Sequence, residues 1–250
     1  MKQHYKPSEL TLRLDPPALG LRYTSAQRLE LSGDGLTVEA EAEEVCLVCI
    51  KGKGSFRHEG QGGEVVLRDI LYLPPGDSVT LEGKDCVLMR FGAPCSAKTR
   101  FAHIPFAEVD ADARHKVYGD EKHGTRRDVW NAIDEQFPSS RFLVGFCTGR
   151  DGGWTAWPPH EHAAEREETY VYFDMGDAFG VQFVYDDMDD PYCVAMIREG
   201  HLVAIPRGFH PNCGCPKGGI SYVYCMVATH EGEREFMDLR CQEIFGDRLA

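Results

Sequence analysis

The sequence predicts an all-β protein made of two barrel-like units, and three observations carry this prediction. Short apolar runs of about five residues alternate with turn-forming clusters of Gly, Pro and Asp. No long amphipathic helix and no alternation of strands with helices is visible, which argues against a nucleotide-binding α/β sheet. The two halves share a rhythm, because Leu73-Pro74-Pro75-Gly76 parallels Ile205-Pro206-Arg207-Gly208. This weak repeat indicates a duplicated unit of roughly 100 residues.

The length and composition are compatible with this architecture. At about 150 residues per domain, 250 residues correspond to roughly 1.7 domains. Hydrophobic residues make up 42% of the chain and charged residues 27%, which is ordinary for a globular protein and argues against disorder. The 26 glycines and 14 prolines are consistent with the many turns of a β-rich fold.

The first half of the chain contains five short runs that read as strands, at residues 45–50, 64–67, 69–73, 78–82 and 86–91. Turn signals rich in Gly, Pro and Asp separate them, at residues 51–54, 61–63, 74–77 and 82–85. The segment 93–127 is rich in charged and small residues and shows little strand periodicity. We therefore expect a linker or a crossing segment there.

Strand-like runs resume in the second half. They lie at residues 141–147, 168–173, 180–184, 192–198, 201–205 and 221–227. The tail, residues 231–249, is expected to hold one short helix.

The charge of the chain limits its partners. The 40 acidic residues exceed the 27 basic ones, so the formal net charge is -13, and a body this acidic repels nucleic-acid backbones.

The N-terminus lacks the apolar run of a signal peptide, and no stretch approaches the roughly 18 apolar residues of a membrane span. We expect a cytoplasmic protein that binds neither nucleic acid nor membrane.

The ten cysteines are expected to be reduced thiols, because the cytoplasm is a reducing compartment. Cys46 and Cys49 lie in one apolar run, and several others occupy similar runs, where a free cysteine behaves as a small buried hydrophobe. Cys213 and Cys215, a closely spaced pair in a loop, are expected to be small loop residues or to line the entrance of a site.

The strongest chemical signal is the segment Trp157-Pro158-Pro159-His160-Glu161-His162. Two histidines two residues apart on a strand direct both imidazoles to the same face, which prepares a metal site. Glutamates follow at 165, 167 and 168, and about forty residues later a Pro-x-Gly turn precedes His210. Three imidazoles and one carboxylate would leave a coordination position open for catalysis.

These residues resemble the paired metal motifs of the cupin superfamily, whose domains are double-sheet jelly rolls. The resemblance is closest to the two-cupin isomerases of 5-deoxy-glucuronate, which act in myo-inositol breakdown, and to the related 4-deoxy-5-hexosulose-uronate ketol-isomerases of pectin breakdown. It covers residues 124–228. The matching pieces are Gly124-Thr125-Arg126-Arg127, Gly153-Trp154, Pro158-Pro159-His160-x-His162, Glu167-Glu168-Thr169-Tyr170, Phe179-Gly180-x-Gln182 and Gly208-Phe209-His210-Pro211.

The resemblance implies a bicupin of two double-stranded β-helix barrels. Residues 1–123 would form an N-terminal barrel without metal ligands, because no His-x-His occurs there. Residues 124–250 would form the metal-binding barrel and the tail. Since two-barrel relatives usually associate, it also implies a homo-oligomer.

The resemblance leaves two choices for the acidic ligand. The usual spacing from His162 selects Glu167, whereas the strand pattern of the pectin-pathway relatives selects Glu168. Strand alternation places Glu168, Tyr170 and Tyr172 on one face and Val171 on the other, which favours Glu168.

The implied activity is a metal-dependent aldose–ketose isomerisation, 5-deoxy-glucuronate to 5-dehydro-2-deoxy-gluconate. Its implied cofactor is a divalent zinc, manganese or iron ion held by the chosen ligands. Candidate proton carriers are Tyr170, Tyr172 and the spare carboxylate of Glu167. Candidate substrate-binding residues are Arg126, Arg127, Gln182 and Lys217. The two arginines and the lysine would face the substrate carboxylate. An Fe(II)-dependent cupin dioxygenase and a non-catalytic sugar-binding cupin are the alternatives.

Overall fold

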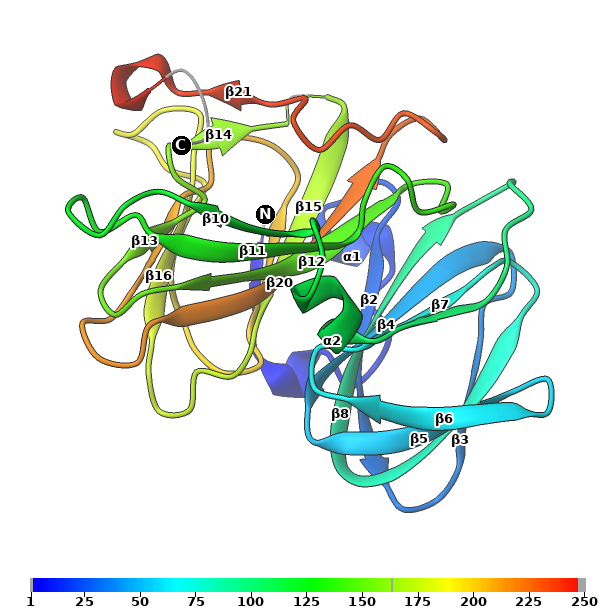
Figure 1. The fold of residues 1–250 in the computed structure, drawn as a ribbon. Helices are drawn as coiled ribbons and strands as arrows, with labels where there is room; N and C mark the ends of the chain where they lie inside the picture. Colours follow the sequence, from blue (N-terminus) through cyan, green and yellow to red (C-terminus); the bar gives the residue numbers. More distant parts are fainter. Residues whose placement is uncertain (1, 163, 247–250) are drawn as a thin grey trace.

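The computed structural model describes residues 2–162 and 164–246, and nearly all of its regular structure is β. Two groups of curved sheets lie against each other, one from each half of the chain (Figure 1). The predicted all-β class is confirmed.

One eight-stranded sheet forms the N-terminal group. Its order is β6-β5-β8-β4-β7-β9, and β2 and β3 also pair with β8. The strands are β2 (Ser25–Ser32), β3 (Leu36–Glu39), β4 (Glu43–Lys51), β5 (Lys53–His58), β6 (Gln61–Val66), β7 (Ile70–Leu73), β8 (Ser78–Pro94) and β9 (Ala102–Ile104).

Three sheets form the C-terminal group, ordered β1-β18-β15-β20-β12-β11-β10, β13-β19-β16-β17 and β14-β21. Their strands are β1 (His4–Tyr5), β10 (His115–Tyr118), β11 (Arg127–Ile133), β12 (Phe142–Gly149), β13 (Trp154–Thr155), β14 (His160–Glu161), β15 (Arg166–Tyr172), β16 (Gly180–Val184), β17 (Cys193–Ile197), β18 (Leu202–Ile205), β19 (Asn212–Gly214), β20 (Ile220–Ala228) and β21 (Arg240–Cys241). The short helices are η1 (Pro7–Glu9), α1 (Pro16–Leu19), α2 (Phe106–Asp110) and η2 (Glu243–Phe245).

The predicted turn at residues 82–85 is wrong, because β8 runs through it without a break. The turn-like residues form an irregularity within the strand. Asp85 has a φ of 56°, and the pairing registers of β2 and β4 with β8 both shift nearby. Gly52 permits the close approach at this point. A Cβ there would lie 2.2 Å from the Asp85 carbonyl oxygen.

The predicted linker at residues 93–127 also proves to be structured. It contains β9, α2 and β10, and β10 pairs with β11 along four residues. These elements are short, and β9 and β10 lie at sheet edges, so they carry little of the apolar alternation by which strands are recognised. The tail contains the strand β21 and the three-residue 3-10 helix η2.

Among the described residues, one of three clusters of buried apolar side chains joins the two halves. One cluster of buried side chains includes Cys46, Tyr72 and Phe91 from the first half and Phe146 and Phe173 from the second. Strands β1 and β10 precede residue 124 but belong to the seven-stranded C-terminal sheet. Sheet pairing therefore does not follow a cut at residue 123, and the division into units 1–123 and 124–250 stays a prediction.

Candidate metal centre

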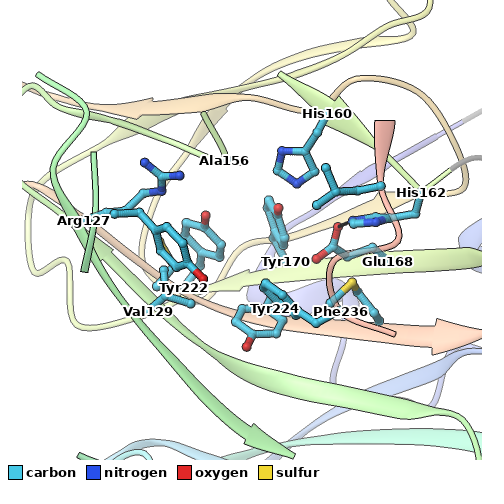
Figure 2. A pocket seen from close by; sticks show the side chains of 14 residues that line it. Arg127, Val129, Ala156, His160, His162, Glu168, Tyr170, Tyr222, Tyr224 and Phe236 are labelled. Carbon is cyan, nitrogen blue, oxygen red and sulfur yellow. Dashed lines mark ion pairs between the residues drawn. The ribbon is translucent and has the colours of Figure 1, made fainter. Parts of the chain in front are cut away.

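Three separate segments bring the predicted ligands together. His160 lies on β14, His162 follows it, Glu168 lies on β15, and His210 lies in the loop between β18 and β19. The ligand atoms of the three histidines lie within 4.8 Å of one another. The Glu168 Oε2 atom is 3.2 Å from His162 Nε2 and 3.1 Å from His210 Nε2. Figure 2 shows His160, His162 and Glu168 facing one end of a cavity.

Backbone carbonyls orient two of the imidazoles. His160 Nδ1 lies 3.0 Å from the Pro158 carbonyl oxygen, and His210 Nδ1 lies 2.8 Å from that of Gly208. An imidazole that donates its Nδ1–H in this way keeps a lone pair on Nε2, directed at the shared centre. Gly208 has a φ of 92°, and a Cβ there would lie 2.8 Å from the Tyr185 carbonyl oxygen, so the turn before His210 requires glycine.

The centre is rich in buried polar atoms without hydrogen-bond partners. These atoms are Nδ1 and Nε2 of His162, Nε2 of His210 and Oε2 of Glu168. Buried polar atoms normally have partners, and leaving one unpaired costs on the order of 1–3 kcal/mol. Nitrogen and carboxylate donors that converge on one point therefore fit a divalent metal ion.

Burial and the contacts between these side chains also favour the protonation states that a bound metal requires. Burial and the neighbouring imidazoles lower the pKa of His160 well below its ordinary value, and burial lowers the pKa of His162. Burial raises the pKa of Glu168, but contacts with His162 and His210 outweigh it and hold this pKa below the usual range. Neutral imidazoles beside a carboxylate are the forms that bind metal.

The cavity next to the centre is lined mainly by aromatic and apolar side chains from the C-terminal group. Besides three of the ligands, its lining consists of Tyr118, Arg127, Val129, Cys147, Ala156, Tyr170, Tyr222, Tyr224, Met226, Phe236 and Leu239. Arg127 lies at the end opposite the ligands (Figure 2).

Of the four predicted substrate-binding residues, Arg127 alone lines this cavity among the described residues. Arg126 pairs with Glu121 outside it, at 3.2 Å, and Lys217 is exposed. Gln182 is fully buried in the core. Its side-chain amide donates to the His210 carbonyl oxygen at 2.8 Å, so it supports the loop that carries this ligand.

The two adjacent glutamates face opposite ways, and Glu167, a predicted proton carrier, lies outside the cavity lining. Its carboxylate accepts hydrogen bonds from the backbone N–H groups of Arg22, Tyr23 and Thr24 and from the Thr24 hydroxyl. Alternation along β15 is the physical reason, since it sends neighbouring side chains to opposite faces. Glu168 thereby lies beside His162 and His210, and Glu167 joins β15 to the segment before β2.

Tyr172, the other predicted proton carrier, is also outside the cavity lining. It is fully buried, and its hydroxyl donates to the Gln182 side-chain oxygen. Cys213 and Cys215 do not line the cavity either, and neither of them forms a disulfide.

Several lining residues are not among those predicted from the sequence. Tyr222, Tyr224 and Met226 alternate along β20, so the period of two in the predicted strand 221–227 could have identified them as one face. Phe236 and Leu239 come from the tail, where no periodic signal exists. They reach the cavity because Arg166 donates to the Glu235 and Asp238 carbonyl oxygens and β21 pairs with β14.

Comparison with known proteins agrees with the predicted family and with this fold. A family model described as the KduI/IolB family matches residues 1–241. The 5-deoxy-glucuronate isomerase of Geobacillus kaustophilus is 28% identical over 240 residues, covering 87% of this chain and 83% of its own. The 4-deoxy-L-threo-5-hexosulose-uronate ketol-isomerase of Cereibacter sphaeroides is 27% identical, covering 86% and 77%.

Two solved structures support the fold. An IolB-like protein from Salmonella typhimurium superposes with a TM-score of 0.81 at 20% identity, covering 98% of both chains. A cupin 2 conserved barrel domain protein from Leptotrichia buccalis gives 0.51 at 16% identity, covering 82% of this chain and 83% of that one. The predicted resemblance and the predicted isomerase class are both confirmed. With its family model spanning nearly the whole sequence, the chain belongs to the KduI/IolB family.

Proposed function

We propose that the chain is a metal-dependent isomerase of an acidic sugar, converting 5-deoxy-glucuronate to 5-dehydro-2-deoxy-gluconate. The observation that carries this proposal is the buried group of His160, His162, His210 and Glu168 at one end of a cavity with Arg127 at the other. The names of the relatives supply the sugar class, since both are isomerases of deoxy-uronate sugars.

The four ligands would hold a zinc, manganese or iron ion, because imidazole and carboxylate donors suit all three. When bound, such an ion supplies a Lewis acid that polarises a carbonyl or hydroxyl oxygen of the sugar. Gln182 and the carbonyl oxygens of Pro158 and Gly208 hold the ligand side chains and loops in position.

Arg127 is the proposed partner of the substrate carboxylate. Its side chain is 3% exposed, donates to the Thr125 and Trp157 carbonyl oxygens, and stacks over the Tyr118 ring. Two of the five guanidinium N–H groups make these hydrogen bonds to described residues. The other three N–H groups remain available for a ligand. A guanidinium held rigidly in a closed site is suited to bind a carboxylate through two parallel hydrogen bonds.

Tyr170 is the proposed proton carrier between the neighbouring carbons of the sugar. Its ring lies 5.8 Å from that of His210 and 4.3 Å from that of Tyr222, so it stands beside the ligands within the cavity. Its hydroxyl makes no hydrogen bond to any residue that the structure describes, which leaves it available to the substrate. Tyr172, by contrast, is bonded to Gln182.

The test combines elemental analysis of the purified protein with an isomerase assay on 5-deoxy-glucuronate and on the pectin-derived uronate. We expect a divalent metal near one equivalent per chain, and isomerisation that a chelator abolishes and the metal restores. Failure to isomerise either sugar acid would contradict the proposed substrate class. Full activity of metal-free protein would contradict the metal. Oxygen consumption by iron-loaded protein would favour the dioxygenase alternative instead.

The predicted cytoplasmic location and the predicted homo-oligomer stay predictions. No helix in the described residues is both long and apolar enough to cross a membrane.

A further inference from the structure

The four-stranded sheet lies away from the N-terminal group of strands, as the positions of β13 and β16 show (Figure 1). One face of this sheet carries exposed apolar side chains. Trp154, Cys213, Val181 and Met196 are successive register partners across β13, β19, β16 and β17. They therefore form one lateral row on one face of the sheet. None of the four is fully buried, and Met196 is 62% exposed.

A second row adds to this surface. Phe183 is the register partner of Val194, which is 58% exposed, and the Phe183 ring stacks on that of Trp154 with centroids 6.0 Å apart. The opposite face of the same strands is buried in the barrel, as the 0% exposure of Gln182 and Ile197 shows. Large exposed apolar patches on a folded protein mark surfaces that contact another molecule.

Strand β17 also has a free backbone edge. It is the last strand in the order β13-β19-β16-β17 among the described residues, so one row of its N–H and C=O groups has no strand partner. Natural proteins protect such an edge with lysines, prolines or bulges, and β17 has none of these within Cys193–Ile197. The open edge and the apolar face thus lie on the same strand.

From this combination we infer that β17 pairs antiparallel with β17 of a second copy of this chain about a twofold axis. The sequence of the strand is self-complementary in that arrangement. With Ala195 opposite Ala195 of the partner subunit, Val194 lies opposite Met196 of the partner subunit. The two exposed apolar rows then form one continuous surface, as an isologous interface requires.

The charges flanking β17 are complementary in the same arrangement. Four exposed aspartates, Asp186, Asp187, Asp189 and Asp190, precede the strand, and the exposed Arg198 follows it. Arg198 makes no salt bridge with the described residues. Antiparallel pairing places Arg198 opposite Tyr192 of the partner subunit, next to that subunit's aspartates. Self-association of a chain with a net charge of -13 therefore gains local attraction at this edge.

The test is the mass of the protein in solution, by sedimentation velocity and light scattering. We expect the wild type to contain at least a dimer at micromolar concentration. We expect V194D/M196D to raise the dissociation constant of that contact by about 100-fold or more, because four carboxylates would meet across the axis. Its metal content and isomerase activity should stay at wild-type levels, which separates this inference from the proposed function. A wild type that is monomeric throughout, or a V194D/M196D variant that associates as before, would overturn the inference.

A matched control and a register test complete the design. L12D/V66D adds two acidic residues at other exposed apolar positions, and Val66 also lies on an edge strand, β6, so this variant should associate like the wild type. V194C/M196C should form a covalent dimer on mild oxidation that the wild type does not form, since residues 194 and 196 would face each other across the axis. Absence of that product would overturn the strand pairing.

Discussion

Two adjacent residues of β15 have unrelated roles, although both are glutamates buried to at least 96%. Glu168 faces the imidazoles of His162 and His210, and Glu167 faces the backbone N–H groups of residues 22–24. The alternation of side chains along a strand produces this division. Substituting the two residues separately should therefore separate metal binding from folding stability.

The Glu168→Gln substitution should remove most of the bound metal and reduce kcat/KM by about 100-fold or more. Loss of a residue that only hydrogen-bonds to a metal ligand already lowers metal affinity or activity by roughly 10–100-fold. His162→Ala should abolish metal binding in the same way while leaving the fold largely intact. Elemental analysis, activity and circular dichroism measure these effects. Full metal retention in either variant would contradict the proposed ligand set.

The Glu167→Gln substitution should leave the metal content unchanged and lower the free energy of unfolding by about 3 kcal/mol. An amide offers one acceptor oxygen where four donors now meet a carboxylate, and hydrogen bonds to a buried charge contribute about 1.5–3 kcal/mol each. Urea denaturation measures the loss. A variant as stable as the wild type would show that these hydrogen bonds contribute little.

Arg127 and Arg126 form a second matched pair. Arg127→Met should raise KM for the sugar acid by about 10–100-fold with unchanged metal content, because a charge-assisted hydrogen bond to the carboxylate is lost. Arg126→Met should leave KM unchanged, since Arg126 pairs with Glu121 outside the cavity. Steady-state kinetics of both variants make the comparison. Equal KM values would exclude Arg127 as the carboxylate partner.

At the scale of elements, short strands from both ends of the described chain pair with strands of the C-terminal group. The first strand, β1, pairs with β18, and β21 in the tail pairs with the ligand strand β14. His4 of β1 and His201, next to β18, lie with their ring nitrogens 2.8 Å apart. Burial lowers the pKa of His201 to about 4, and His4, Lys6 and Arg198 act in the same direction while Glu9 opposes them.

This histidine pair predicts a pH-dependent stability. Between about pH 6.5 and pH 4 the unfolded chain binds more protons at His201 than the folded chain, so the free energy of unfolding falls as the pH falls through this window. The site is half exposed, so we expect a contribution of only about 1 kcal/mol after screening. In urea denaturation at pH 7 and pH 4.5, His201→Gln should lose less stability than the wild type. His230→Gln, at an exposed position, is the control, and an identical pH response of all three proteins would contradict the assignment.

At the scale of the whole molecule, the two halves depend on each other. Apolar residues of both halves share one core cluster, although each half also has a cluster of its own. Glu44 of β4 accepts hydrogen bonds from the backbone N–H groups of Ser140 and Arg141. Tyr72 donates to the same carboxylate from the first half. The N-terminal strands therefore support the C-terminal group of strands through shared packing, although they supply none of the proposed metal ligands.

This shared core predicts that the protein unfolds in one transition. Near-UV and far-UV circular dichroism should give the same midpoint in urea, and a fragment of residues 124–250 should not fold, because it would expose the core face that now contacts residues such as Phe91 and Met89. Two separated transitions, or a fragment that binds metal, would instead support the predicted division into independent units.

The sequence by itself determined the all-β class and the proposed metal ligands, because both depend on short-range patterns. Strand alternation separates Glu168 from Glu167, and His160, His162 and His210 stand beside local turn motifs. Only the tertiary structure decided which cation and which tyrosines line the cavity, and that Phe236 and Leu239 reach it from the tail. Those positions depend on the pairing of strands far apart in the chain. Local periodicity shows that a strand exists but does not identify its neighbour.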